Sequence, residues 1–206
     1  MEKFVIHCGV AVPLVRNNID TDAIIPSREM TRVSKQGLGE GLFAGWRYTL
    51  PGNREPNNEF ILNRVEYANA SVILAGSNFG CGSSREHAVW ALYEYGVRVV
   101  IAQSFGTIFY NNCIRNGILP VCLSADDILV LANTVKPNPQ LNKLTVDLPA
   151  LTVSSKDGRQ FHFKLDESHQ QMLLEGLDSI ALTMKMDAQI SAFEQQDRLQ
   201  RPWIYL

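Results

Sequence analysis

The sequence has few cysteines, and none of them is spaced for a metal or disulfide motif. Its 206 residues include only Cys8, Cys81, Cys113 and Cys122, and no Cys-x-x-Cys pair occurs. A self-contained zinc or iron–sulfur site needs closely spaced ligands, and a disulfide framework needs a regular set of cysteines. We therefore expect no metal site on this chain and interpret each cysteine as a buried thiol.

Long apolar runs and an excess of one charge are also missing. No run approaches the roughly 18 to 20 apolar residues that cross a bilayer. The formal net charge is −2, which gives no positive field for nucleic acid. The first residues, Met1 to Ile6, contain an acid and a short strand-like segment instead of a secretion signal. We expect a soluble, cytoplasmic protein that binds neither nucleic acid nor membrane.

The glycine-rich segment at 76–87, Gly-Ser-Asn-Phe-Gly-Cys-Gly-Ser-Ser-Arg-Glu-His, lacks the features of the commoner glycine motifs. It contains no lysine, so it is no Walker loop for a nucleotide triphosphate. Arg85 stands where a dinucleotide fingerprint needs its third glycine. Ser84 is followed by Arg85 and Glu86, which excludes a Gly-x-Ser-x-Gly hydrolase elbow.

The same segment has the pattern of a strand, a turn and a helix. Ser71 to Ala75 is apolar and strand-like, and the helix is expected to run to about Tyr95, where Gly96 would end it. Two serines and Arg85 would lie in the first helical turn. Because free amides and the helix dipole favour an anion there, the sequence predicts a binding site for a carboxylate or phosphate. Arg85 would add a bidentate donor.

A purely structural interpretation of these residues is also open. Ser83 and Glu86 have the spacing of a capping box, in which the serine only satisfies free helix amides. A cap accounts for one serine, but not for the glycines, the second serine and the arginine together. His87 is compatible with a proton carrier or with a hydrogen-bonded supporting role, and the sequence favours the supporting role.

At these residues the chain resembles a known family. The run Gly80-Cys-Gly-Ser-Ser-Arg-Glu-His-Ala88 resembles the signature of the swivelling domain of the aconitase superfamily. Nearly the whole chain is similar to the small-subunit family of bacterial 3-isopropylmalate dehydratase, with further matches at 18–26, 104–112 and 176–183. The resemblance implies an α/β fold, the three-layer β/β/α swivelling domain like the C-terminal domain of aconitase.

The resemblance also implies an activity and a partner. Members dehydrate and rehydrate a hydroxydicarboxylate, interconverting 2-isopropylmalate and 3-isopropylmalate in leucine biosynthesis. Their [4Fe-4S] cluster is carried by a separate large subunit, so this chain would bind no cofactor itself. The implied roles are a catalytic base at Ser83, substrate binding by Ser84, Arg85, Thr21 and Asp22, and support from Gly80, Gly82, Glu86 and His87.

The segment after Asp22 departs from the pattern of aconitases proper. Ala23, Ile24 and Ile25 replace a more polar stretch that includes an active-site serine, so that serine's role has no counterpart here. The segment that would contact the substrate's side group offers both an apolar wall and cations. The candidates for apolar contact are Ile25, Met30 and Val33. The side chains of Arg28 and Arg32 would either face solvent or reach a substrate carboxylate.

An isopropyl group favours the apolar interpretation. Related substrates, namely citraconate with methylmalate, homoaconitate or a dimethylmalate, remain alternatives. A carboxylate-binding scaffold without catalysis is a further alternative. The intact Gly82-Ser83-Ser84-Arg85 weighs against it, because a scaffold would need a helix cap but no pair of reactive side chains.

The chain is long enough for one domain over residues 1–206. Around the signature, apolar strands are expected at 97–102 and 118–123, with a serine-capped helix at 104–116 between them. The pattern then predicts a helix from Asp126, strands near 144–146, 151–153 and 161–164 with a hairpin turn at 156–158, and a mostly helical tail.

Residues 34–58 are rich in glycine and proline, which predicts a long irregular excursion. Its aromatic residues, Trp46 and Tyr48, would contact either this chain or a partner.

Overall fold

A computed structural model describes residues 1–30, 34 and 36–205. Its strands are β1 (Ile6–Leu14), β2 (Ala70–Ala75), β3 (Val99–Ala102), β4 (Leu119–Cys122), β5 (Leu144–Asp147), β6 (Thr152–Ser154) and β7 (Gln160–His162). Its α-helices are α1 (Thr21–Ile24), α2 (Ala44–Arg47), α3 (Glu86–Tyr95), α4 (Thr107–Arg115), α5 (Ala125–Val135), α6 (Glu167–Glu175), α7 (Ser179–Met184) and α8 (Asp187–Gln200). Short 3-10 helices are η1 (Ser27–Glu29), η2 (Gly39–Gly41), η3 (Ile61–Asn63), η4 (Val65–Tyr67) and η5 (Pro202–Ile204).

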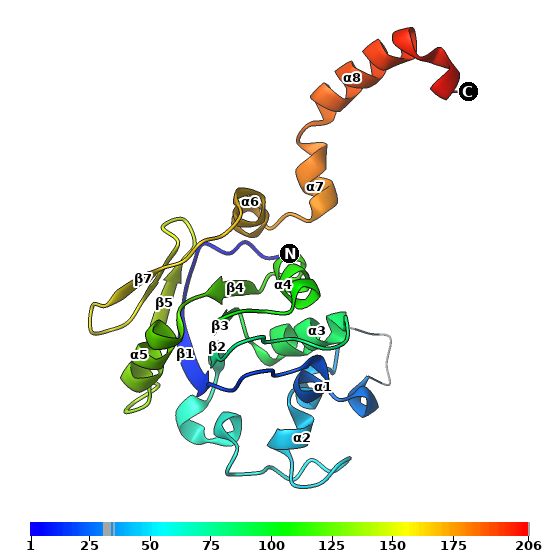
Figure 1. The fold of residues 1–206 in the computed structure, drawn as a ribbon. Helices are drawn as coiled ribbons and strands as arrows, with labels where there is room; N and C mark the ends of the chain where they lie inside the picture. Colours follow the sequence, from blue (N-terminus) through cyan, green and yellow to red (C-terminus); the bar gives the residue numbers. More distant parts are fainter. Residues whose placement is uncertain (31–33, 35, 206) are drawn as a thin grey trace.

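The strands form a curled sheet in the order β4-β3-β2-β1-β5-β6-β7 (Figure 1). β1 belongs to both halves of this sheet. Its first residues pair antiparallel with β5, and its last residues pair parallel with β2. The pairing register with β2 shifts between Val10 and Ala11, because Val10 pairs with Ala70 and Ala11 with Val72. The extra residue, Ser71, is a bulge in β2, and a bulge bends its strand locally. One long strand therefore joins a parallel half to an antiparallel half.

Apolar side chains on the two faces of the parallel half pack into two separate cores. Ile73 and Val100 belong to the core that includes α3 and apolar side chains from residues 19–25 and 38–67. Val72 and Leu74 belong to the second core, which includes α5, α6 and the antiparallel strands. Both faces are covered, which is why β3, and β2 from Val72 onward, are apolar and do not alternate with polar residues. This layering confirms the predicted swivelling-type α/β fold.

Most of the predicted elements are present, but one predicted cap is wrong. Helix α3 ends as expected at Gly96, which has φ +111° and donates its amide to the carbonyls of Leu92 and Tyr93. Ser104, in contrast, does not cap α4, whose N-cap is Gly106. The Ser104 hydroxyl instead accepts the amide of Asn78 at 2.9 Å, so it links two loops that the sequence pattern does not relate.

The excursion at 34–58 contains the two helical turns η2 and α2. Trp46 stacks on Phe43 with 5.4 Å between ring centroids and 5° between the ring planes. The Tyr48 hydroxyl donates to the carbonyl of Glu40 at 2.9 Å. Both aromatic side chains therefore contact their own chain, which was one of the two interpretations open from the sequence.

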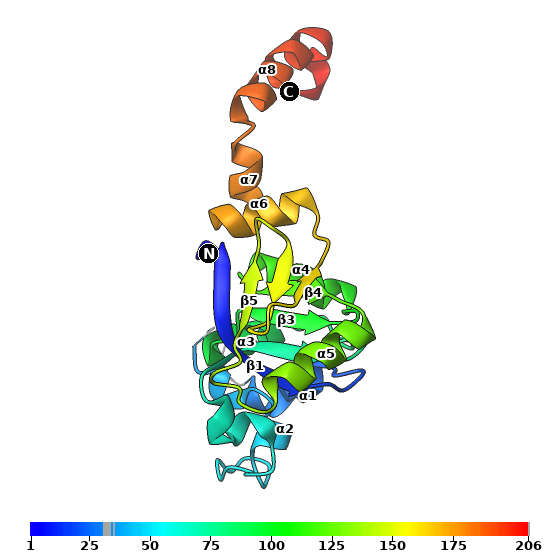
Figure 2. The ribbon, with the colours of Figure 1, turned by 90° about the vertical axis from the view of Figure 1, so that its left-hand side faces the viewer.

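The tail is helical, as predicted, and its last part leaves the body of the protein. Helix α6 contributes Met172 and Leu173 to the second core. Helix α8 lies away from the sheet and its covering helices in both perpendicular views (Figures 1 and 2). Within the described residues, no helix is both long and apolar enough to cross a membrane.

The two cores predict how leucine substitutions affect stability. Leu74 of β2 is 0% exposed, whereas Leu129 of α5 is 52% exposed. Replacing Leu74 with Ala removes buried methyl groups and leaves a cavity, so we expect the free energy of unfolding to fall by about 2 to 5 kcal/mol. Leu129→Ala is the matched control and should change it by less than about 1 kcal/mol. Chemical denaturation of both variants measures the difference, and equal losses would contradict this assignment of the core.

Candidate active site

Three loops meet at the carboxyl ends of the parallel strands, where open α/β sheets usually bind ligands. They follow β1 (residues 15–20), β2 (76–85) and β3 (103–106). The amide of Gly76 donates to Arg16 at 3.0 Å, the amide of Gly80 to Ile19 at 2.7 Å, and the amide of Phe79 to Ser104 at 3.0 Å. Backbone pairing therefore continues past the strand ends and fixes the serine loop, residues 80–85, against its neighbours.

Glycine is required where these loops approach each other. Gly80 has φ +71°, and a Cβ placed there would lie 2.1 Å from the ring of Phe109. A Cβ on Gly106 would lie 2.7 Å from the carbonyl oxygen of Gly80. Both distances are below van der Waals contact, so the start of α4 packs on the serine loop only because both positions lack a side chain.

Thr21 of α1 holds the backbone of the serine loop. Its hydroxyl donates to the carbonyl of Ser83 at 3.0 Å, and its amide donates to the carbonyl of Cys81 at 2.9 Å. Thr21 is 1% exposed, so both bonds are shielded from water. The amide of Arg85 is a second donor to Ser83, at 2.8 Å. The hydroxyls of Ser83 and Ser84 are exposed and have no hydrogen-bond partner among the described residues.

The predicted capping box is wrong. Helix α3 begins at Glu86, its N-cap is Arg85, and no side chain in the described part of the chain caps it. The serines therefore precede the helix instead of lying in its first turn. Glu86 does not turn back to the cap because its carboxylate accepts from the Asn116 amide at 2.9 Å. The His87 ring contacts the Trp90 ring, with centroids 4.8 Å apart.

Arg85 and Asp22 form an ion pair that links the serine loop to α1. The Arg85 side chain is 24% exposed and that of Asp22 is 56% exposed. Only the Nη1 nitrogen of the guanidinium is engaged with Asp22, and a guanidinium carries five N–H donors. The pair therefore orients Arg85 and leaves donors free for a second carboxylate.

A cavity of about 300 Å³ opens beside Ser83. It lies between the serine loop and the first turn of α4, and its lining residues are Gly80, Cys81, Gly82, Ser83, Gly106, Thr107, Ile108 and Phe109. No described side chain caps the start of α4. Its free amides and helix dipole therefore favour negative charge in the cavity. The sequence pattern did not reveal this second helix end, because it favours Ser104 as the cap.

None of the described residues of the predicted specificity segment lines this cavity. Ile25 is 0% exposed and packs in the first core, so its assignment to a substrate-facing wall is corrected: the side chain faces inward. Met30 is partly buried against the same core. Arg32 and Val33 lie outside the described residues.

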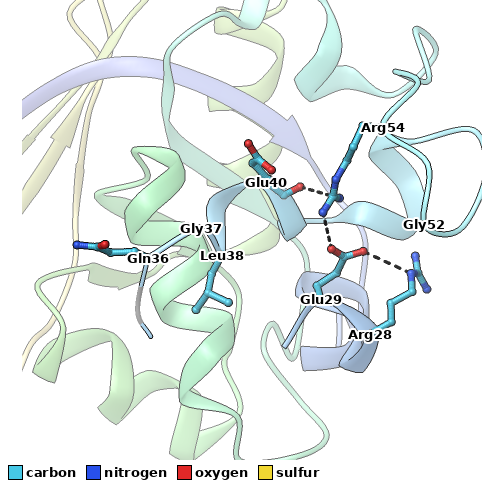
Figure 3. A pocket seen from close by; sticks show the side chains of 8 residues that line it. All are labelled: Arg28, Glu29, Gln36, Gly37, Leu38, Glu40, Gly52 and Arg54. Carbon is cyan, nitrogen blue, oxygen red and sulfur yellow. Dashed lines mark hydrogen bonds and ion pairs between the residues drawn. The ribbon is translucent and has the colours of Figure 1, made fainter. Parts of the chain in front are cut away.

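Arg28 lies in a different pocket from the serines, beside Glu29 and Arg54 (Figure 3). The Glu29 carboxylate lies between the two guanidinium groups, 3.4 Å from Arg28 and 2.7 Å from Arg54. This arrangement links η1 to the loop around residue 54. Arg54 was not predicted as a site residue, and no local sequence pattern relates it to Glu29.

Glu94 is another residue that the sequence did not single out. Its carboxylate accepts the amides of Gly37 at 2.6 Å and Gly39 at 2.8 Å. Desolvation by itself would raise the pKa of Glu94. Hydrogen bonds from the amides of Gly37, Gly39 and Leu38 outweigh it and hold the pKa of this carboxyl below its ordinary value. The ionised carboxylate thus ties the loop after the specificity segment to α3, the helix that follows the serines.

The described residues do not provide a site for a metal or an iron–sulfur cluster. No group of three or more histidine, cysteine, aspartate or glutamate side chains among them converges on one point. The cysteines are scattered: Cys113 is buried, Cys81 is half-buried, and Cys8 and Cys122 are exposed. The expectation that all four thiols are buried is therefore wrong for Cys8 and Cys122.

Comparison with known proteins identifies the family. Residues 1–126 match the Aconitase C-terminal domain family, and residues 179–205 match the family described as the C-terminal domain of the 3-isopropylmalate dehydratase small subunit. A 3-isopropylmalate dehydratase small subunit from Cupriavidus necator is 58% identical over 205 residues, covering 100% of this chain and 99% of the relative. The protein of the same name from Brevibacillus brevis is 47% identical over 94% of this chain and 98% of its own.

A solved structure supports the same family relationship. The crystal structure of 3-isopropylmalate dehydratase from Methanocaldococcus jannaschii is 27% identical, covers 91% of this chain and 98% of its own, and superposes with a TM-score of 0.65. The resemblance seen in the sequence is thus confirmed in sequence and in fold. This chain belongs to the family of 3-isopropylmalate dehydratase small subunits.

Proposed function

We propose that this chain is the small subunit of a hydro-lyase that interconverts 2-isopropylmalate and 3-isopropylmalate, and that the serine loop is its half of the active site. The observation that carries the proposal is the pair of exposed serine hydroxyls beside Arg85, unbonded within the described residues, on a backbone fixed by Thr21. A scaffold would need the fixed backbone, but it would not need two free hydroxyls beside a cation.

Ser83 is the proposed base. In the dehydration, its oxygen takes the proton from the carbon next to a carboxylate, and in the rehydration it returns that proton. A serine is a weak acid, so this role requires its oxygen to be stabilised when negatively charged. The uncapped start of α4, which lines the same cavity, and the nearby Arg85 supply that stabilisation.

Ser84 and Arg85 are the proposed ligands of a substrate carboxylate. The guanidinium can hold a carboxylate through two parallel N–H donors. Asp22 keeps it from turning into solvent, because the two side chains are paired. Gly82, at φ +92°, lets the loop present consecutive hydroxyls without a side chain between them and α1.

The large subunit is the proposed partner, and it is expected to carry the [4Fe-4S] cluster. When bound there, the cluster would supply a Lewis acid for the departing hydroxyl. This chain's residues would bind a carboxylate, orient the substrate and move the proton. One domain spanning residues 1–206 remains our proposal for the organisation of this half of the enzyme.

The division into subunits predicts the behaviour of the isolated chain. Purified alone, it should be colourless, contain no stoichiometric iron and have no hydratase activity, because its described residues form no cluster site. Anaerobic mixing with the large subunit should produce turnover of 2-isopropylmalate, followed through the absorbance of the unsaturated intermediate. Substantial turnover by the isolated chain would contradict the proposal.

Two serine variants separate catalysis from capping. Ser83→Ala should lower kcat of the complex by roughly 10² to 10⁴ through loss of the proton transfer, while the free energy of unfolding changes by less than about 0.5 kcal/mol, because Ser83 does not cap α3. Ser124 does cap α5, accepting the amide of Asp127 at 3.1 Å. Ser124→Ala should cost about 1 kcal/mol of stability and leave kcat unchanged. If Ser83→Ala instead loses stability and keeps its kcat, the base is another residue.

Met30 tests the apolar interpretation of the specificity segment. Met30→Ala should raise KM for isopropylmalate more than for methylmalate, because it removes apolar contacts to the larger side group. One or two methyl contacts change the preference between two such substrates by about 10 to 200-fold. Arg28→Ala is the companion variant and should leave the substrate ranking unchanged, since Arg28 is paired with Glu29. Loss of activity in Arg28→Ala with an unchanged ranking in Met30→Ala would point to a substrate with a third carboxylate.

A further inference from the structure

The last part of the chain, residues 179–205, forms an arm made of α7, α8 and η5. In both perpendicular views α8 lies away from the rest of the protein (Figures 1 and 2). Asp197 is the one buried residue of this 14-residue helix, all of which is described. It accepts from Arg201 at 2.6 Å and from the Tyr205 hydroxyl at 2.7 Å, so even this burial is local to the arm.

The arm carries an apolar stripe that nothing in the described structure covers. Met186, the N-cap residue of α8, is followed by Ile190 and Phe193 at spacings of four and three. These spacings place the three side chains on one side of the helix. Their exposed fractions are 54%, 36% and 62%. Ile180 and Met184 of α7, 72% and 56% exposed, add a second pair at a spacing of four. An exposed apolar surface of this extent is typical of a protein contact site.

The helix itself needs a partner. An isolated helix of about 12 to 15 residues is only marginally stable in water, and most helices are stabilised by packing of their apolar face. Asp197, Arg201 and Tyr205 fix how η5 folds back on α8, but they do not cover the stripe. Leu182 attaches α7 to the second core, whereas Met186, Ile190 and Phe193 pack against neither core of the described residues. The free part of the arm is therefore α8 with its stripe.

The family matches indicate which protein offers the docking surface for the arm. The Aconitase C-terminal domain family matches only residues 1–126, whereas the arm matches a family described as belonging to the small subunit. A domain of a longer chain is held to its neighbour by the chain itself, but a separate subunit needs its own attachment. A second contact away from the catalytic one strengthens attachment through effective concentration.

We propose that the arm docks in an apolar groove of the large subunit, with Met186, Ile190 and Phe193 as the central contacts. This is the helix-in-groove mode, in which residues at spacings of three and four anchor the helix. The inference rests on the proposed function, because that function supplies the partner. No described arm residue lines the cavity beside Ser83, so the arm acts on assembly and not on the chemical step.

The test uses the full chain with two single charge substitutions on α8. Phe193→Glu places a charge in the stripe, and Ser191→Glu, the matched control, places it at an exposed position on another side of the same helix. We expect Phe193→Glu to raise the Kd for the large subunit by about 30-fold or more, with kcat at saturating subunit within about twofold of wild type. Ser191→Glu should leave both unchanged. Kd is measured by titrating activity and by sedimentation of the mixed subunits, and thermal unfolding confirms that both variants fold.

Each contrary result has a distinct meaning. Equal Kd values for the two variants overturn the arm as a docking element. If wild type alone sediments as a dimer, Phe193→Glu as a monomer, and the Kd for the large subunit is unchanged, the stripe binds a second copy and the inference is wrong. A wild-type complex that forms but turns over no 2-isopropylmalate contradicts the proposed function, while sedimentation still decides the role of the arm. A wild-type chain that does not bind the large subunit overturns both.

Discussion

The candidate site depends on one close backbone approach, between the serine loop and the start of α4. Gly80 and Gly106 meet there, and neither has room for a Cβ. Without this approach the loop after β2 would separate from the loop after β3, and the first turn of α4 would no longer line the cavity beside Ser83. The same approach packs the Phe109 ring over Gly80. A contact that involves no functional side chain thus decides where the functional side chains lie.

A fixed backbone and free side chains are combined within a few residues of the serine loop. The carbonyl of Ser83 accepts two hydrogen bonds, from Thr21 and Arg85, while its hydroxyl has no partner among the described residues. The polar groups around it are paired elsewhere: Glu86 with Asn116, and Arg85 with Asp22. Pre-paired neighbours reduce the rearrangement needed when a substrate binds, which is the physical basis of preorganisation.

The sequence predicted those features that depend on local pattern. The apolar strand before the signature, the end of α3 at Gly96 and the hairpin turn between β6 and β7 follow from residue types within a few positions. Two of the wrong predictions concern polar side chains with a choice of partners. Ser83 and Ser104 are good caps by type, but Glu86 bonds to Asn116, 30 residues away, and Ser104 bonds to the loop at Asn78. Likewise, Ile25 has the same local pattern whether it faces a ligand or the core, and tertiary packing places it in the core.

The regular alternation of β1 sets the phase between the two halves of the sheet. Its residues up to Gly9 pair with β5, and its residues from Val10 onward pair with β2. Because side chains alternate along a strand, a shift of one residue moves every later side chain to the opposite face. A single-residue insertion or deletion in β1 would therefore leave one half in register and turn the other half inside out, exchanging Ala11 with Val10 and Val12 between the two cores. Length variation in this family should thus be tolerated in the surface loops and in the segment at 34–58, but not between residues 6 and 14.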